Sequence, residues 1–244
     1  MTDDRKILKK VFSDLAPRYE KTMEGELNRF WGWSYDGFVQ QLIDHSEIED
    51  DQFILDIATG TSVIPRKIID TGLKRIHIIG LDITEAMLRQ GKKNNANEPY
   101  QSTISLTCAD GMKLPFANNS YDLVVTGLSA HHMDVPVMLS EIKRVLKPNG
   151  KLSIIDVGMA EFWRHPIIRP LTRVATFVYF LFAENISRAV AEARDMINLK
   201  TPEGWDAALT AAGYTSIKIH KLPSKFSWIP EPLSIQSKLQ EEEL

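Results

Sequence analysis

Asp56 and Asp82 are carboxylates at the ends of two apolar segments, where they could hold a nucleotide-like ligand. Asp56 lies in the segment 53–62, which reads FILDIATGTS, and four apolar residues flank it before a turn of small residues. Asp82 ends the second segment, RIHIIGLD, about twenty residues beyond the turn. An acidic residue at that distance can accept two hydrogen bonds from the hydroxyls of a ribose.

The turn after Asp56 has the pattern D-x-A-x-G-x-S, with Ala58, Gly60 and Ser62 as its small residues. Small residues allow the backbone to pass close to a ligand. A helix that starts at Val63 would offer free N–H groups to polar ligand atoms. The chain has no G-x-G-x-x-G, which argues against a dinucleotide-binding protein. On this stretch alone, an α/β turn without any ligand remains an equal alternative.

His131 and His132 follow the apolar segment 121–126 in the sequence LSAHHMD. Histidine titrates near neutral pH, so either residue could accept a proton in catalysis. A structural role is the alternative interpretation. Two histidines also suggest a metal, but no third ligand stands at metal spacing nearby in the sequence. We therefore predict no metal site.

The segments around these residues alternate between strand-like and helix-like patterns, which predicts a parallel α/β sheet. A first helix is expected over residues 3–22, before the sheet begins. A sixth strand is expected at 214–222, and a weak seventh at 226–229, before Pro230. The first five strands are expected at 53–57, 75–82, 103–108, 121–126 and 151–157.

Five motifs occur in order within residues 53–157: D-x-A-T-G-T, G-L-D-I-T-x-x-M-L, A-D-G-x-x-L-P-F, Y-D-L-V and L-K-P-N-G-K-L. This order resembles the class I S-adenosylmethionine (SAM) dependent methyltransferases. Within them it is most similar to the ubiquinone/menaquinone biosynthesis C-methyltransferase family (methyltransferase type 11). The resemblance implies a Rossmann-like α/β fold with a mostly parallel seven-stranded sheet, helices on both faces and a helical lid. It also implies SAM as the cofactor, bound across the carboxyl ends of the first strands.

The resemblance assigns roles to individual residues. Asp82 is implied at the ribose, Asp110 at the adenine, and the segment after the fourth strand near the methionine ammonium group. Ser62 stands in place of a glycine and is expected to weaken cofactor binding by crowding the turn. The full set of expected cofactor-binding residues is Arg18, Tyr19, Asp56, Ala58, Thr59, Gly60, Asp82, Ile83, Asp110, Gly111, Met112, Thr126 and Gly127.

The apolar insert 159–200 interrupts the alternation between the fifth and sixth strands, where this fold usually carries acceptor recognition. We predict a lid over a mostly apolar small acceptor, such as a quinol or phenol methylated at a ring carbon. Methylation at O or N, in secondary metabolism or on lipid headgroups, is one alternative. A member of the fold that binds SAM without methylating is another. The insert also allows brief contact with a membrane surface, whereas a packing role or a dimer interface is the simpler account.

Length and composition predict one domain: a cap at 1–50, a cofactor core at 51–158, the lid at 159–200, and the rest of the sheet at 201–244. The net charge of −3 and the pI of about 6.1 give no basic footprint for nucleic acid. The single cysteine, Cys108, lies in a strand-like run, so a buried structural thiol is expected. The N-terminus has no apolar core typical of a signal peptide, so a cytoplasmic protein is expected.

Overall fold

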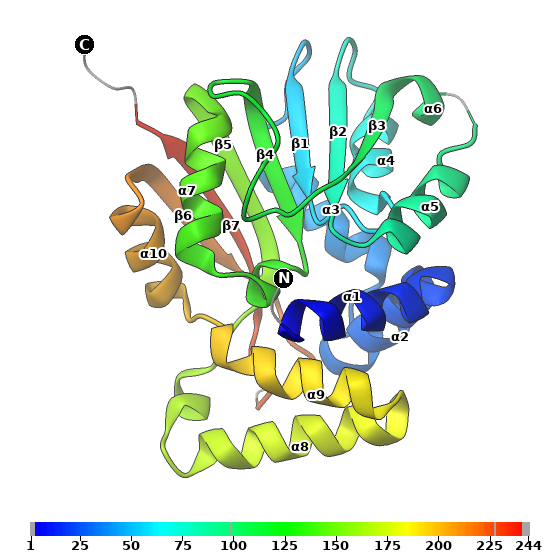
Figure 1. The fold of residues 1–244 in the computed structure, drawn as a ribbon. Helices are drawn as coiled ribbons and strands as arrows, with labels where there is room; N and C mark the ends of the chain where they lie inside the picture. Colours follow the sequence, from blue (N-terminus) through cyan, green and yellow to red (C-terminus); the bar gives the residue numbers. More distant parts are fainter. Residues whose placement is uncertain (1–2, 98, 227, 241–244) are drawn as a thin grey trace.

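The computed structural model describes residues 3–97, 99–226 and 228–240. Its centre is a seven-stranded sheet in the order β3-β2-β1-β4-β5-β7-β6, in which β7 runs opposite to the other six strands (Figure 1). The predicted fold class is confirmed. The strands are β1 (Phe53–Ile57), β2 (His77–Asp82), β3 (Ile104–Cys108), β4 (Tyr121–Gly127), β5 (Leu146–Val157), β6 (Tyr214–Lys221) and β7 (Pro232–Leu239).

Helices cover both faces of this sheet because side chains of a strand point alternately to its two faces, and both sets are apolar here. In β1, Ile54 packs with α3 and α4, whereas Leu55 packs with α7 and α10 on the other face. The helices are α1 (Asp3–Leu15), α2 (Tyr19–Trp31), α3 (Tyr35–His45), α4 (Val63–Asp70), α5 (Glu85–Asn94), α6 (Tyr100–Thr103), α7 (Val135–Val145), α8 (Ile168–Ala183), α9 (Ile186–Asp195) and α10 (Pro202–Ala211).

The expected N-terminal helix over 3–22 is two helices in the structure. A short 3₁₀ turn at Ala16–Arg18 separates α1 from α2. Pro17 explains the break, since proline lacks a backbone N–H and clashes with the preceding turn of an α-helix. The chain therefore changes direction, and α1 lies across the carboxyl ends of the parallel strands (Figure 1).

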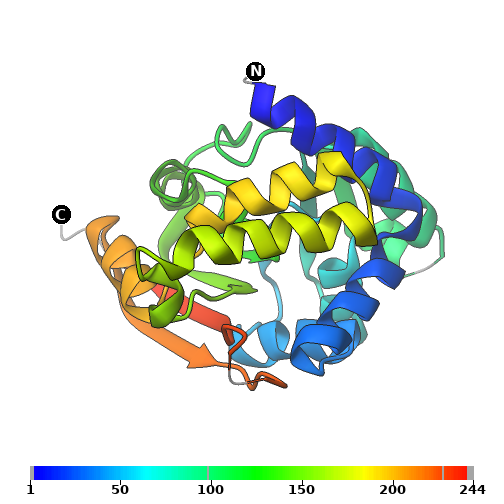
Figure 2. The same ribbon diagram turned by 90° about the horizontal axis from the view of Figure 1, so that it is seen from below.

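The insert forms two helices, α8 and α9, that lie side by side below the same end of the sheet (Figures 1 and 2). Of the two, α9 is nearer the sheet and packs against α1. Across the ranges that the structure describes, none of the helices is both long and apolar enough to pass through a bilayer.

Two expectations about the edges of the sheet are wrong. The seventh strand does not occupy 226–229; it begins at Pro232, where a missing N–H is tolerated at the first residue of a strand. Cys108 is exposed rather than buried, because it is the last residue of β3, the edge strand.

The fifth strand begins earlier than the expected residue 151, since 147–150 also lie inside β5. Tyr121 pairs with Leu146 and Leu123 with Lys151, so the extra residues form an irregularity in the pairing of β4 and β5. Asn149 lies among these extra residues and has a left-handed φ of 63°, a conformation that asparagine tolerates better than most residues.

Ser62, just before α4, is buried with a left-handed φ of 66°, and its hydroxyl faces α5. A Cβ added at Gly91 would lie 2.7 Å from Ser62 Oγ. We expect Gly91→Ala to lower the free energy of unfolding by about 1–3 kcal/mol, through overpacking. Ser62→Gly should restore part of this loss, because it removes the hydroxyl and accepts the left-handed φ.

Gly25→Ala in α2 is the matched control, since a Cβ there has no neighbouring atom within 4 Å. It should raise stability slightly, by about 0.5–1 kcal/mol, through helix propensity. Urea unfolding of the three single variants and of the Gly91→Ala, Ser62→Gly double variant measures these effects. Additive effects of the two substitutions would show that Ser62 and Gly91 do not contact each other.

Candidate functional site

The turn after β1 is held by the carboxylate of Asp82, at the end of β2. Its Oδ2 accepts a hydrogen bond from Gly60 N at 3.0 Å, and its Oδ1 accepts one from Thr84 N at 2.7 Å. Ala58, Gly60 and Ser62 all have φ near +60°, between 55° and 66°. Burial raises the pKa of Asp82, while the two backbone N–H groups oppose that shift. The turn is thus tightly wound, and Asp82 faces the space beside it.

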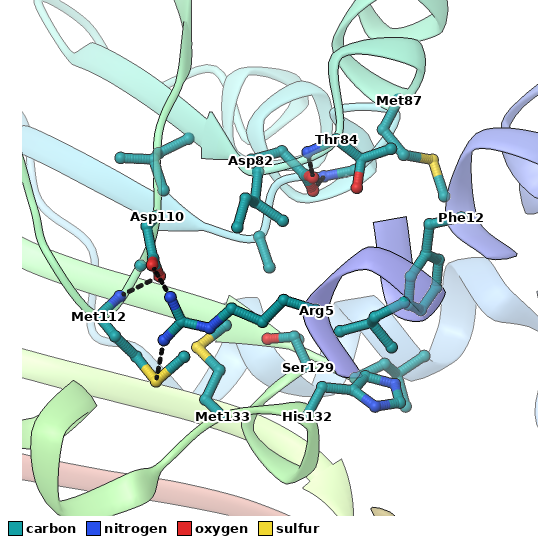
Figure 3. Close-up of a pocket in the computed structure, with 18 of the residues that line it drawn as sticks. Arg5, Phe12, Asp82, Thr84, Met87, Asp110, Met112, Ser129, His132 and Met133 are labelled. Carbon is teal, nitrogen blue, oxygen red and sulfur yellow. Dashed lines mark hydrogen bonds and ion pairs between the residues drawn. The ribbon is translucent and has the colours of Figure 1, made fainter. Parts of the chain in front are cut away.

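This space is a cavity of about 90 Å³ between the turn and α1 (Figure 3). Ten of the residues predicted as functional line it: Tyr19, Ala58, Gly60, Asp82, Ile83, Asp110, Gly111, Met112, Gly127 and His132. They come from the ends of several strands and from the start of α2. Their roles in binding SAM stay predictions.

Four predicted cofactor residues do not reach this cavity. Asp56, Thr59 and Thr126 are buried behind it, and Thr126 Oγ1 donates to Ile57 O at 2.7 Å. Arg18 is exposed and forms an ion pair with Glu184, at the end of α8, with Nη1 2.9 Å from Oε1. The Ser62 hydroxyl also points away from the cavity, toward α5, so it does not narrow the space for a cofactor.

Sequence reasoning missed the contribution of α1, which brings Arg5, Leu8 and Phe12 to the cavity. Arg5 reaches across it to Asp110, with Nη1 2.5 Å from Oδ2 (Figure 3). The apolar spacing of this helix indicates only that it packs on something. No sequence signal shows which of its residues face the site.

A second and larger cavity, of about 540 Å³, lies between α2 and the insert. Its walls are mostly apolar and include Trp31, Trp163, Tyr179 and Phe180. Phe177, which is also on α8, is not part of the wall. The two cavities share four residues, which therefore mark where they meet: Phe12, Tyr19, Leu128 and His132.

One end of the second cavity is polar. Arg188 is 4% exposed and pairs with Glu26, with Nη2 2.8 Å from Oε2. Its guanidinium also lies 4.8 Å from the ring centroid of Phe180. Burial raises the pKa of Glu26 to about 7, although Arg188 opposes the shift. A buried arginine with carboxylate partners thus supports the wall built by α9.

His131 and His132 stand at this polar end, and a buried carboxylate orients each ring. His131 Nδ1 lies 2.7 Å from Oδ1 of Asp156, and His132 Nδ1 lies 2.7 Å from Oδ2 of Asp195. Burial lowers the pKa of His131, but the charge and hydrogen bond of Asp156 outweigh it and raise that pKa to about 9. Nε2 is the ring nitrogen left for a ligand in each case.

The prediction that His131 and His132 lack a third metal ligand considered only residues nearby in the sequence. In space, Glu192 of α9 joins them, and one ligand atom from each of the three residues lies within 4.8 Å of the other two. Neither the spacing of the histidines nor the helical pattern around Glu192 indicates this meeting.

The residues of the first cavity fit SAM chemically. A Cβ at Gly111 or Gly127 would lie 2.8 Å from the side chains of Ile57 and Ile64, respectively, so the cavity floor requires glycine. The carboxylate of Asp82 can accept ribose hydroxyls beside its backbone bonds. However, 90 Å³ is well below the ~300 Å³ of small cofactor sites. We infer that Arg5 and α1 must shift when SAM binds.

The family described as "Methyltransferase domain" matches residues 55–154. A demethylmenaquinone methyltransferase of Corynebacterium urealyticum is 30% identical over 166 residues, which cover 63% of this chain and 67% of that protein. One from Desulfitobacterium hafniense is 30% identical over 150 residues, or 61% of this chain and 57% of that protein. The chain thus spans less than two thirds of the second relative. The crystal structure of the [4+2]-cyclase SpnF has the same fold, with a TM-score of 0.71 at 12% identity over 96% of both chains.

Asp56 is fully buried, and burial raises the pKa of its carboxyl to about 8, with Thr59 opposing and Asp82 adding to the shift. The folded protein therefore holds this proton more tightly than the unfolded chain does. Its contribution to the free energy of unfolding is complete below pH ~4 and is lost as pH rises through about 8. Asp56→Asn should remove this loss and be the more stable protein at pH 9, by about 1–3 kcal/mol.

Urea unfolding at a series of pH values measures the slope. Asp206→Asn, at an exposed position on α10, is the control and should keep the wild-type slope. An Asp56→Asn protein whose stability falls as steeply as wild type between pH 5 and 9 would contradict the assignment.

The Arg5–Asp110 pair must separate if SAM is to reach Asp110. The two side chains are 36% and 26% exposed, so solvent screens the pair and it is worth about 1 kcal/mol at most. Arg5→Ala should therefore tighten SAM binding by up to about fivefold in calorimetry. Lys10→Ala, on the exposed side of the same helix, should change little.

Asp82→Ala is expected to act in the opposite direction, weakening SAM binding by about 1.5–3 kcal/mol through lost charge-assisted hydrogen bonds. Weaker binding in Arg5→Ala would mean that the guanidinium contacts the cofactor rather than obstructing it. Unchanged binding in Asp82→Ala would refute the ribose assignment.

Proposed function

Because the chain belongs to the class I SAM-dependent methyltransferases, we propose that it transfers a methyl group from SAM to an apolar, hydroxyl-bearing aromatic acceptor of the quinol or phenol type. The family resemblance seen in the motifs is confirmed by the family match and by the relatives. Those relatives are named demethylmenaquinone methyltransferases, which supports an acceptor of the quinol type.

The observation that carries this proposal is the junction of the two cavities. Phe12, Tyr19, Leu128 and His132 line both, so a methyl group held on one side faces an acceptor held on the other. The volume of the second cavity, about 540 Å³, lies in the range of about 300–1,000 Å³ found for small-molecule sites. Its apolar wall suits an apolar molecule.

Bound in the first cavity, SAM would supply a methyl group already activated on a sulfonium, and in-line displacement would pass it to the acceptor atom and leave S-adenosylhomocysteine. The protein's part is to hold the two reactants in line and to exclude water. In this proposal α1 and the 1–50 segment cover SAM, and the insert 159–200 covers the acceptor.

The acceptor must also lose a proton, and we propose that the two histidines assist this in different ways. With a pKa of about 9, His131 is protonated at neutral pH and would stabilise negative charge on the acceptor, whereas His132 would accept the proton. Their side chains are 12% and 8% exposed and lie where the polar end of the second cavity meets the first. An acceptor hydroxyl placed there would be near the imidazoles, while its apolar part would lie along Tyr179 and Phe180.

The test is transfer of a labelled methyl group from SAM to a panel of quinols, phenols and amines. We expect S-adenosylhomocysteine and a methylated quinol or phenol. His132→Asn should lower the maximal rate by about 10²–10⁴-fold, a typical contribution of acid–base assistance, with SAM affinity near wild type. His77→Asn, at the amino end of β2 and exposed, is the control.

The other candidate activities give different results in the same assay. Product labelled on oxygen or nitrogen would replace the ring-carbon assignment with O- or N-methylation. SAM binding without any S-adenosylhomocysteine across the panel would contradict transfer and indicate a non-methylating member of the fold. Normal rates in both His131→Asn and His132→Asn would show that the pair is structural.

We also propose brief contact of α8 with a membrane surface, through which an apolar acceptor enters. Its outer side exposes Leu171, Val174 and Phe182 at 63%, 61% and 85%, respectively. The helix contains two arginines and no acidic residue, which suits an anionic lipid surface. These features are typical of amphipathic helices that bind at the bilayer interface.

Sedimentation with anionic vesicles should capture the protein, and Leu171→Ser with Phe182→Ser should abolish capture while leaving the fold intact. Phe53→Ser is the control, because Phe53 is an exposed apolar residue at the amino end of β1, whereas the insert lies at the carboxyl end. A dimer that these substitutions dissociate, without vesicle binding by the wild type, would identify the face as a protein interface instead.

A further inference from the structure

His131, His132 and Glu192 form a cluster with the composition of a metal site. The histidines follow β4, and Glu192 comes from α9 in the insert. One ligand atom of each lies within 4.8 Å of the others. Metal bonds of ~2.1 Å would place these atoms ~3.4 Å apart, so a movement of about 1 Å per atom suffices. All three residues line the second cavity.

The surroundings of the cluster match those of a built metal site. In such sites each histidine gives its second ring nitrogen to a carboxylate, which sets the tautomer and the ring orientation. Here Asp156 and Asp195 do so for His131 and His132 at 2.7 Å each. Both carboxylates are nearly inaccessible, with side chains 2% and 4% exposed. The two rings lie side by side, with centroids 4.0 Å apart, and each keeps Nε2 for a ligand.

The charges near the cluster also favour a cation. Asp156, Asp195 and Glu192 surround the two imidazoles with three carboxylates. Arg194 offsets part of this charge through Asp195, with Nε 2.7 Å from Oδ1. Arg188 Nε lies 3.4 Å from Glu192 Oε1, a long contact that leaves the other carboxylate oxygen for a metal.

We propose that His131, His132 and Glu192 bind a divalent transition-metal ion. Two imidazole nitrogens and one carboxylate oxygen suit Zn²⁺, Fe²⁺, Mn²⁺ or Co²⁺ and leave coordination positions open. The open positions face the second cavity, where a hydroxyl or carbonyl oxygen of the acceptor can occupy them. Because the ion would occupy the free ring nitrogen of both histidines, it would replace the proton acceptance proposed above: it would orient that oxygen, favour loss of its proton and stabilise the negative charge on it. It would also link the insert to the core.

The experiment is calorimetric titration of the full chain with Zn²⁺, Mn²⁺, Fe²⁺ and Co²⁺ separately, in a buffer that sets the free ion at micromolar levels. We expect one ion per chain. Glu192→Gln and His132→Ala should each weaken binding at least tenfold, and Asp195→Asn by about 10–100-fold although it touches no ion. The relative affinities of the four ions show which metal the site prefers.

Glu161→Gln and His77→Asn are the controls, because both residues are exposed and lie outside the cavity. Both should bind the ion as wild type does. If a variant fails to fold, metal binding by the wild-type protein still tests the proposal. Electron paramagnetic resonance of the Cu²⁺-loaded protein should show coupling to two imidazole nitrogens.

The proposal is overturned if the wild type binds none of the four ions. It is also overturned if folded Glu192→Gln and His132→Ala bind like wild type, or if fewer than two imidazoles couple to Cu²⁺. These readouts need neither SAM nor an acceptor. A failure of the metal site is therefore distinguishable from a failure of the proposed methyl transfer.

Discussion

The arrangement of the site depends on one carboxylate, that of Asp82, which binds the backbone of two successive βα connections. By accepting from Gly60 N and Thr84 N, it joins the turn after β1 to the turn after β2. The left-handed non-glycine residues of the first turn, Ala58 and Ser62, need such a constraint, because that conformation is unfavourable for residues other than glycine. The floor of the first cavity and the starts of α4 and α5 follow from this junction.

A second set of contacts attaches the insert to that frame. His132 binds Asp195 at the end of α9, and Asn198 donates to the carbonyl of His131 at 2.9 Å. These bonds hold the C-terminal end of the insert against the loop after β4. The second cavity therefore forms between α9, α8 and α2. Breaking one partner of such a buried pair leaves an uncompensated polar group, which is costly. His131 and His132 thus attach the insert, which walls the second cavity, to the loop that lines the first cavity.

The errors of the sequence-based interpretation have local physical causes. Pro17 splits an otherwise continuous amphipathic pattern, and the pattern alone does not show the change of direction. The last strand begins at Pro232, although proline usually argues against a strand, because its first position needs no N–H. Cys108 follows apolar residues yet is exposed, since it ends an edge strand.

The sequence by itself determined six of the seven strands, their parallel arrangement and the edge of the sheet at which Asp82 and the small-residue turn meet. Apolar runs, a small-residue turn and an acid at the end of the next strand are local patterns, and local patterns define βα units. The carboxyl ends of β1, β2, β3 and β4, with the segments that follow them, therefore carry nine of the ten expected functional residues at the first cavity, and α2 carries the tenth, Tyr19.

Only the tertiary structure decided what covers those ends. Arg5 meets Asp110 across 105 positions of sequence, and Glu192 meets His131 and His132 across about sixty. Such meetings depend on how α1 and α9 dock, which is set by the summed packing of many apolar side chains and by a few buried ion pairs. An amphipathic pattern indicates that a helix has a buried face but not its partner, so the pairing of charged residues on helices far apart in the chain is decided by the folded structure.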